Sequence, residues 1–442
     1  MLKKIIIIVF IIFTLCSLLY GQSADETPQP EEKPEFNFDM GIVIGLSNYE
    51  DVDGVQNGYQ RLGFLPHFSY GMWRFGFNFT FEFDGDFSLR DLDKDGRADT
   101  WTSLIDWLYK LEYVEYAEKG EPIYGLIGEF DSYYLGNGML LKDFNNNLFY
   151  PYILQRGLLF DFDAGVVNFP FIGIESIVND VLDWDVLGAR LFVRPLAGLN
   201  VPISQLEVGG TVVADLDPKQ KYDSKDTRPP KDNAASKTVT TFGIDVGLPL
   251  MTSEDMALET YVDWAMIMDK GNGFSAGADF RYKWIEFVAE LRFLGKQFEP
   301  HYFDPFYWVE RPDKYNDLDL ITDRYIGYLV GVDLNLWNKV IFYFHWEDGL
   351  VDVSEPRIAK PRITTGIALD EEALKKIGFH ITYDKKGIGS LDDFIDLDNS
   401  LFEALFEYRV TDFASIVFVQ QQSFAPSFKS VSNTSIETRF QF

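Results

Sequence analysis

Residues 73–84 alternate aromatic and polar side chains without a break. Trp or Phe occupies every odd position, and polar, charged or glycine residues occupy every even one. In a helix these rings would scatter around the axis, whereas in a strand they share one face. Soluble strands usually have about five or six residues, while a tilted membrane-spanning strand needs about nine to eleven. The stretch therefore predicts a membrane-spanning β-strand whose aromatic face meets lipid.

The same alternation recurs along the chain. It is found in residues 36–47, 59–70, 206–216, 241–248, 274–284, 326–335 and 402–408. Tight links occur near Gly71, Gly120, Ile285, Asn338 and Thr411, and long polar links fill 85–105, 131–154, 217–238, 298–323, 348–357, 385–399 and 422–432. Short periplasmic turns alternating with long external loops are typical of outer-membrane barrels. We therefore predict an all-β fold, a transmembrane antiparallel up-and-down β-barrel of about 20 strands, with 18 as the alternative count. Residues 166–174 form either a strand or a segment folded into the lumen.

The N-terminus has the pattern of a secretory signal. Lys3 and Lys4 precede an apolar run from Ile5 to about Leu19, and small or polar residues begin at Gly21. The run is shorter than the roughly twenty residues that a spanning helix needs. We predict a cleaved signal peptide over residues 1–21, with an uncleaved anchor or a lipoprotein acylated at Cys16 as alternatives. Residues 22–35 form an acidic, proline-rich periplasmic lead, and residues 36–442 form the barrel with its long extracellular loops.

The charge of the chain limits its partners. The formal net charge is −30, and it becomes −32 once the signal is lost, because residues 1–21 contain two lysines and no acid. Such acidity excludes nucleic-acid binding as a function. The acids either keep exposed loops soluble or create a negative potential at a pore mouth that concentrates cations.

Catalysis finds no support in the sequence. The only imidazole bases are His67, His301, His345 and His380, and none lies in a nucleophile, metal or phosphate motif. We therefore predict that the protein is not an enzyme.

The last residues alternate in a pattern of their own. The chain ends Ile436-Glu437-Thr438-Arg439-Phe440-Gln441-Phe442. Ile436, Phe440 and Phe442 resemble the C-terminal assembly signal of outer-membrane β-barrel proteins of the porin type, although Thr438 stands where a larger apolar residue is commoner. The resemblance implies insertion by the barrel assembly machinery. It names an architecture and no subfamily.

One loop has the spacing of a calcium site. Residues 91–99 read DLDKDGRAD, with oxygen ligands at loop positions one, three, five and nine and Gly96 at six. This spacing resembles an EF-hand-type loop, in which a tight turn wraps oxygens around Ca²⁺. Position twelve is Thr102, where a bidentate acid is normal. The candidate metal residues are Asp91, Asp93, Asp95, Arg97 and Asp99, and the alternative is a solvated acidic turn.

Two further loops are unusual. Residues 301–308 contain five aromatic side chains, which either fold into the lumen as a constriction or sugar-stacking surface or cap the barrel rim at the membrane interface. Residues 133–138 begin a second loop with Gly136 and Gly138, whose lack of a side chain permits close backbone approach. That loop is either an inward-folded constriction or an ordinary turn.

The predicted inner face is rich in acids. Its candidate pore-lining residues are Asp39, Arg74, Glu82, Glu207, Asp215, Asp245, Glu259, Asp263, Asp279, Arg281, Glu290, Arg292 and Asp333. Acidic rings favour cations in channels, so this face predicts a mild cation preference. The alternative is that these charges are solvated or paired across strands.

Together these features predict a channel in the bacterial outer membrane, after signal cleavage, for passive diffusion of small hydrophilic solutes. The alternatives are a surface protein whose loops bind a partner or calcium, in adhesion or a structural role, and a plugged carrier of apolar substrates. No cofactor is required, and the one ion that the sequence suggests is Ca²⁺. The expected partners are outer-membrane lipid, the barrel assembly machinery and small solutes, and an oligomer is compatible with the sequence.

Overall fold

The computed structural model describes residues 35–50, 55–90, 104–150, 154–201, 203–219, 238–350, 361–370, 373–394, 396–425 and 428–442. The predicted signal peptide, the lead up to residue 34 and the predicted calcium loop lie outside these residues. The calcium site therefore stays a prediction.

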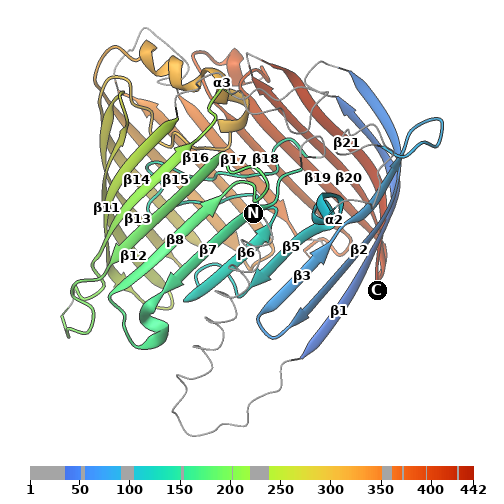
Figure 1. Cartoon of the computed structure of the whole chain (residues 1–442), viewed down its shortest axis with the longest axis horizontal. Helices are drawn as coiled ribbons and strands as arrows, with labels where there is room; N and C mark the ends of the chain where they lie inside the picture. The colour runs from blue at the N-terminus through green and yellow to red at the C-terminus, as the bar shows by residue number, and fades with distance from the viewer. Residues whose placement is uncertain are drawn as a thin grey trace, which may run out of the picture.

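The described strands form one antiparallel sheet that closes on itself (Figure 1). They are β1 (Phe36–Glu50), β2 (Gln56–Tyr70), β3 (Trp73–Phe77), β4 (Phe79–Phe83), β5 (Leu111–Tyr116), β6 (Ile123–Gly128), β7 (Gly157–Asp163), β8 (Ile172–Val178), β9 (Val186–Val193), β10 (Glu207–Asp215), β11 (Val239–Thr252), β12 (Met256–Ile267), β13 (Asn272–Tyr282), β14 (Ile285–Leu294), β15 (Tyr325–Leu336), β16 (Val340–Gly349), β17 (Arg362–Leu369), β18 (Ile377–Lys385), β19 (Ser400–Thr411), β20 (Ala414–Ala425) and β21 (Phe428–Gln441). β1 pairs with β21 from Gly41↔Gln441 to Glu50↔Ser432, which closes the barrel. Because β3 and β4 both pair with β2 as halves of one wall segment, the 21 strands make a barrel of 20, as predicted.

The predicted strand over residues 73–84 is not continuous. The structure divides it at Asn78 into β3 and β4, and the register of β3 against β5 shifts between Gly76 and Phe77. The Asn78 amide donates to the Lys110 carbonyl (2.8 Å), and the Asn78 side-chain oxygen accepts from the Thr80 amide (3.1 Å). These bonds replace ladder bonds in the way that a β-bulge does. The rings of Phe77 and Phe79 still stack, with centroids 5.8 Å apart, so the aromatic face continues across the break.

Large apolar side chains cover the outside of the barrel. Ile44, Ile244, Phe293 and Ile436, which belong to four different strands, are each about half exposed. A monomeric soluble protein rarely exposes so extensive an apolar surface. Aromatic side chains such as Trp337, which is 81% exposed, lie at the tight turns, as is usual for the interfacial belts of membrane proteins. The outer surface therefore has the chemistry of a lipid-facing wall.

The described helices are few and short. They are α2 (Leu104–Lys110) and α3 (Tyr307–Asp317), with 3-10 turns η1 (Ala164–Val167), η2 (Leu318–Leu320) and η4 (Asp392–Phe394). In the described part of the chain, no helix has the length and apolar character needed to cross a membrane.

The two ends of the barrel differ in their links. The turn end carries the tight links 71–72, 117–122, 253–255, 283–284, 337–339 and 412–413, and β1 begins and β21 ends there. The loop end carries the long links, including α3 (Figure 1). Residues 166–174 fit neither alternative as a whole. Their first part is the end of η1 and a turn at Asn168 (φ 60°), and the strand begins only at Ile172. The tight turn starts at the end of β7, because the Asp163 side chain accepts a hydrogen bond from the Gly165 amide.

A glycine makes room for a lumen ring in β13. A Cβ on Gly277 would lie 2.3 Å from Cζ of Tyr261, whose hydroxyl donates to Glu290 (3.0 Å). We expect Gly277→Ala to displace this ring and to cost about 1–3 kcal/mol, as overpacking does. The measurement is the temperature at which the barrel in detergent loses its compact, heat-modifiable band on a gel. Gly210→Ala is the control, because a Cβ there meets nothing within 4 Å. Equal transition temperatures for the two variants would contradict the packing argument.

Candidate functional site

Two long loops from the loop end fold into the barrel. The first, of which residues 129–150 and 154–156 are described, joins β6 to β7, and the second, residues 295–324, joins β14 to β15 and contains α3. Their backbones pair side by side: the Phe303 amide donates to the Leu140 carbonyl (3.0 Å), and the Lys142 amide donates to the Phe303 carbonyl (3.0 Å). The two loops therefore form one unit inside the barrel, which we call the inner plug.

The aromatic cluster of residues 301–308 forms the centre of the inner plug. Phe303 and Tyr307 have no exposed surface, and Trp308 is 2% exposed. Their rings surround Phe144 of the first loop with centroid distances of 5.4–6.5 Å. The cluster therefore folds inward, and it neither caps the rim nor offers a surface on which a sugar could stack.

The loop that begins at residue 133 also folds inward. The Tyr133 hydroxyl donates to Asp161 of β7 (2.6 Å), and the Asn137 side-chain amide donates to Asp263 of β12 (3.1 Å). Gly136 has φ +56°, and a Cβ there would lie 2.9 Å from Nε of Arg190. Glycine is thus required both for the backbone conformation and for the close approach to the wall. Of the two predicted alternatives, the inward fold is the one observed.

A buried ion pair fixes α3 to the wall. Nε and Nη2 of Arg311 each donate to an oxygen of Asp215 on β10, both at 2.6 Å, and the Tyr307 hydroxyl donates to the same carboxylate (2.5 Å). Arg311 and Asp215 have no exposed surface. Two parallel charge-assisted bonds hold the guanidinium in one orientation. The inner plug is therefore attached to the barrel by a contact that is costly to break.

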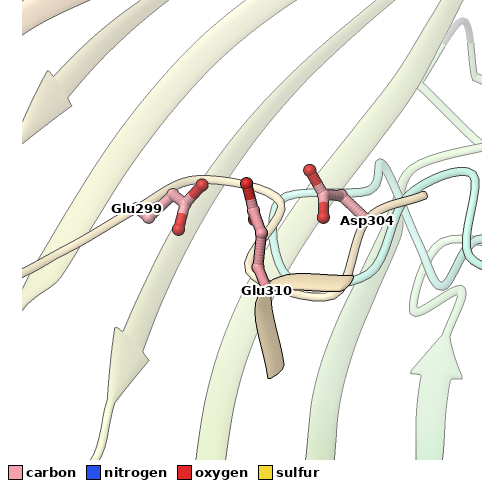
Figure 2. A group of neighbouring side chains, drawn as sticks. All are labelled: Glu299, Asp304 and Glu310. Carbon is pink, nitrogen blue, oxygen red and sulfur yellow. The ribbon is translucent and has the colours of Figure 1, made fainter. Parts of the chain in front are cut away.

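Three carboxylates of the second loop meet at one place. Figure 2 shows Glu299, Asp304 and Glu310 facing one another, close enough for one metal ion to reach all three. The ammonium groups of Lys314 and Lys386 already lie between them, at 3.0 and 2.6 Å from Asp304. A metal ion would have to displace two cations, so the cluster does not fit a metal site.

The pKa values in this cluster follow the same arrangement. Burial alone would favour the neutral forms. The lysines outweigh it at Asp304 and hold the pKa of that carboxyl below its usual range, while the three acids hold the pKa of Lys314 well above its own. At Glu299 burial prevails and raises the pKa, and one of its oxygens has no hydrogen-bond partner in the described part of the protein.

His301 is part of the inner plug rather than an acid–base group open to solvent. Burial and the nearby Arg292 lower its pKa well below the ordinary value, so the ring is neutral at pH 7. A neutral ring can accept from Arg292, whose guanidinium nitrogen lies 3.2 Å from Nε2. His301 therefore joins the second loop to β14.

The structure places all thirteen predicted pore-lining residues on the face opposite the exposed apolar side chains. Most have a partner: Asp215 and Asp263 hold the inner plug, Asp245 and Glu207 bind Arg190, and Asp333 lies 2.9 Å from His345. Asp39, Arg74, Glu82, Glu290 and Arg292 also have polar partners, and no bond or ion pair of Glu259, Asp279 or Arg281 occurs among the described residues. Pairing is therefore the commoner state of these charges.

Several important residues were not predicted. Arg190 donates to Asp245 (3.0 Å) and Glu207 (2.7 Å), but it lies outside the segments in which alternation was recognised. Arg311, Lys314 and Lys386 lie in loops, where strand alternation gives no information. For Arg311 and Lys314, the one feature of the sequence that could have indicated a shared role is their spacing of three residues after the aromatic cluster, which would place them on one face of a helix.

Open space remains beside the inner plug. A cavity of about 610 Å³ lies between residues 131–150 of the first loop and the wall from β16 to β21. Its lining includes Asp131, Asp143, Glu403 and Asp384, but no lysine or arginine among the described residues. Asp384 is neutralised by Arg362, whose two nitrogens donate to it at 2.8 and 2.5 Å. Three carboxylates thus line this space with no lysine or arginine beside them among the described lining residues, and none of the thirteen predicted residues borders it.

Comparisons with known proteins give little beyond architecture. No family model and no curated protein sequence matches the chain. Similar solved structures include the outer membrane protein OprD of Pseudomonas aeruginosa (8% identity, TM-score 0.37, 92% of this chain and 94% of that one). Others are Pseudomonas aeruginosa OccK3 (10%, 0.38, 92% and 96%) and Acinetobacter baumannii OccAB2 (9%, 0.36, 92% and 98%). These similarities are too low to support statements about substrate. The closed antiparallel barrel itself confirms the porin-type architecture predicted from the sequence.

The attachment of α3 can be tested by proteolysis. Arg311→Met leaves Asp215 buried without its cation, which typically costs about 3–5 kcal/mol. We expect the second loop to open at least roughly a hundredfold more often. Chymotrypsin should then cleave after the aromatic residues 302–308, which are buried in the native protein. Arg439→Met is the matched control, because that arginine is 42% exposed and pairs with Glu437 far from α3. Similar cleavage rates in both variants would show that the pair does not hold the loop.

Proposed function

We propose that the protein is a channel of the bacterial outer membrane through which small hydrophilic solutes diffuse passively, with a mild preference for cations. The observation that carries this proposal is the cavity of about 610 Å³ beside the inner plug, with its acidic lining. A barrel of 16 to 18 strands already encloses an aqueous channel. A barrel of 20 therefore has room both for the inner plug and for a path beside it.

The chemistry of the cavity supports polar solutes. Asp131 and Asp143 accept hydrogen bonds from Asn147 and Ser132, and Glu403 accepts from Gln421 and lies 3.9 Å from His380. Among the described residues, no lysine or arginine pairs with these three carboxylates. Negative charge in a low-dielectric cleft raises the local concentration of cations. The amide and hydroxyl groups of the lining, including Asn145, Thr364, Gln422 and Asn433, can replace water around an uncharged solute. A carrier of apolar substrates would need an open apolar path, whereas the aromatic side chains at the centre of the plug are packed against one another.

The membrane location follows from the same features. The apolar outer wall supports contact with lipid, and the alternating C-terminal strand supports insertion by the barrel assembly machinery. We propose that the chain reaches the outer membrane after loss of its signal peptide.

The selectivity of single channels tests this function. We would measure the reversal potential of the purified barrel in a planar bilayer under a KCl gradient. The native protein is expected to be cation-selective, and the triple variant D131N/D143N/E403Q should lower the cation-to-anion permeability ratio by roughly twofold or more, because the potential in the cavity falls. Asn and Gln keep the hydrogen-bond acceptors, so the fold should persist.

The matched control removes three exposed acids away from the cavity, in the variant E254Q/D313N/D323N. It should keep most of the native selectivity. A folded, heat-resistant barrel that passes no current would contradict the channel. An equal effect of both triple variants would contradict the path beside the inner plug.

A further inference from the structure

A second space lies on the outer side of the wall, at the loop end. This groove of about 680 Å³ is formed where β13 begins, β14 ends and β15 begins. Phe293 and Ile326 contribute to it, and both belong to the exposed apolar face of their strands. The groove is therefore continuous with the lipid-facing wall and separate from the lumen cavity.

The charge of the groove is opposite to that of the chain as a whole. Lys270, Lys296 and Arg324 line it, and its lining contains no acid among the described residues. Lys270 donates to Asp319 (2.6 Å), which lies outside the lining. Lys296 and Arg324 are exposed, and neither forms an ion pair within the described part of the chain. The protein has 39 basic and 69 acidic residues, so two neighbouring cations without an acidic partner are unusual in it. Lys296 and Arg324, beside the apolar side chains of Phe293 and Ile326, therefore favour binding of an anionic partner.

The level of these cations along the barrel wall indicates how deep in the membrane the anionic partner would lie. β14 has ten residues, about the length that a tilted strand needs to cross the hydrocarbon core. Phe293 is its second-last residue, so it lies at the edge of the core, and Lys296 lies just beyond the strand end. Arg324 stands at the same level, immediately before β15. The groove thus presents apolar side chains to acyl chains and cations to the headgroups above them.

We propose that this groove binds the phosphate-bearing headgroup of an anionic glycolipid of the outer leaflet, with the acyl chains against Phe293 and Ile326. The proposal rests on the membrane location given under the proposed function, but not on conduction. The groove places cations beyond apolar side chains along the membrane normal, and this arrangement favours an amphiphile over a free anion. A free anion would gain no binding energy from the apolar side chains of Phe293 and Ile326. Binding of lipid to one place on the wall would also fix the neighbouring loop that carries α3.

The test measures lipid binding directly. The full barrel in a neutral detergent is titrated with diphosphoryl lipid A, and bound copies are counted by native mass spectrometry. Since a basic residue near an anionic membrane surface contributes about 1 kcal/mol, K296Q/R324Q should weaken binding by roughly tenfold or more. The matched control K283Q/K375Q removes two exposed cations at the turn end and should bind like the native protein.

Two further arms decide the source of the phosphate. Inorganic phosphate at the same concentration should not displace lipid A, and monophosphoryl lipid A should bind more weakly than the diphosphoryl form. Unchanged binding by K296Q/R324Q, or displacement by inorganic phosphate, would overturn the proposal. Conductance of K296Q/R324Q in a phospholipid bilayer is expected to equal that of the native protein, so a failure here is distinct from a failure of the channel.

Discussion

The hydrogen bonds between the first and last strands are the interaction on which the rest of the structure depends. Within hydrocarbon every peptide group must find a partner in the protein, and a sheet satisfies this condition only when it has no edge. The pairing of β1 with β21, from Gly41↔Gln441 to Glu50↔Ser432, removes both edges at once. Closure at 20 strands sets a circumference too wide for wall side chains to fill. The interior is therefore completed by loops rather than by the wall.

The loops are held inside the barrel by polar contacts as well as by apolar packing, because the inner face of the wall carries both kinds of residue. Apolar wall residues such as Val213 and Ile267 belong to the same buried cluster as the plug aromatics, and charged wall residues add ion pairs and hydrogen bonds to that packing. Asp215 holds Arg311, Asp263 holds Asn137, and Arg292 holds His301. The aromatic rings fill the contact between the two loops and form one buried cluster with apolar side chains of the wall. This arrangement uses basic residues in buried pairs and leaves the acids of the open cavity without cations.

The period of two made the barrel predictable from the sequence, because lipid on one face and water on the other act on every residue of a strand separately. Tight turns and an even strand count follow from the same local pattern. The break at Asn78 could not be predicted, since the carbonyl that Asn78 binds belongs to Lys110, far along the chain. For the same reason the sequence could place Asp215 on the inner face but could not show that Arg311 lies against it. Residues 301–308 were recognisable as unusual, but their partner Phe144 lies in another loop, so inward folding stayed one of two alternatives.

Composition alone gives a misleading view of this protein's electrostatics. A formal charge of −30 would suggest a negative surface everywhere, yet the inner and outer sides of the wall at the loop end differ in sign. Charges separated by more than about 8 Å of physiological electrolyte are largely screened from one another. In the proposed channel an ion in the cavity would respond mainly to Asp131, Asp143 and Glu403. In the proposed lipid site a headgroup would respond to Lys296 and Arg324. In the proposed channel and lipid site, one strongly acidic chain would attract cations inside the barrel and an anionic headgroup outside it.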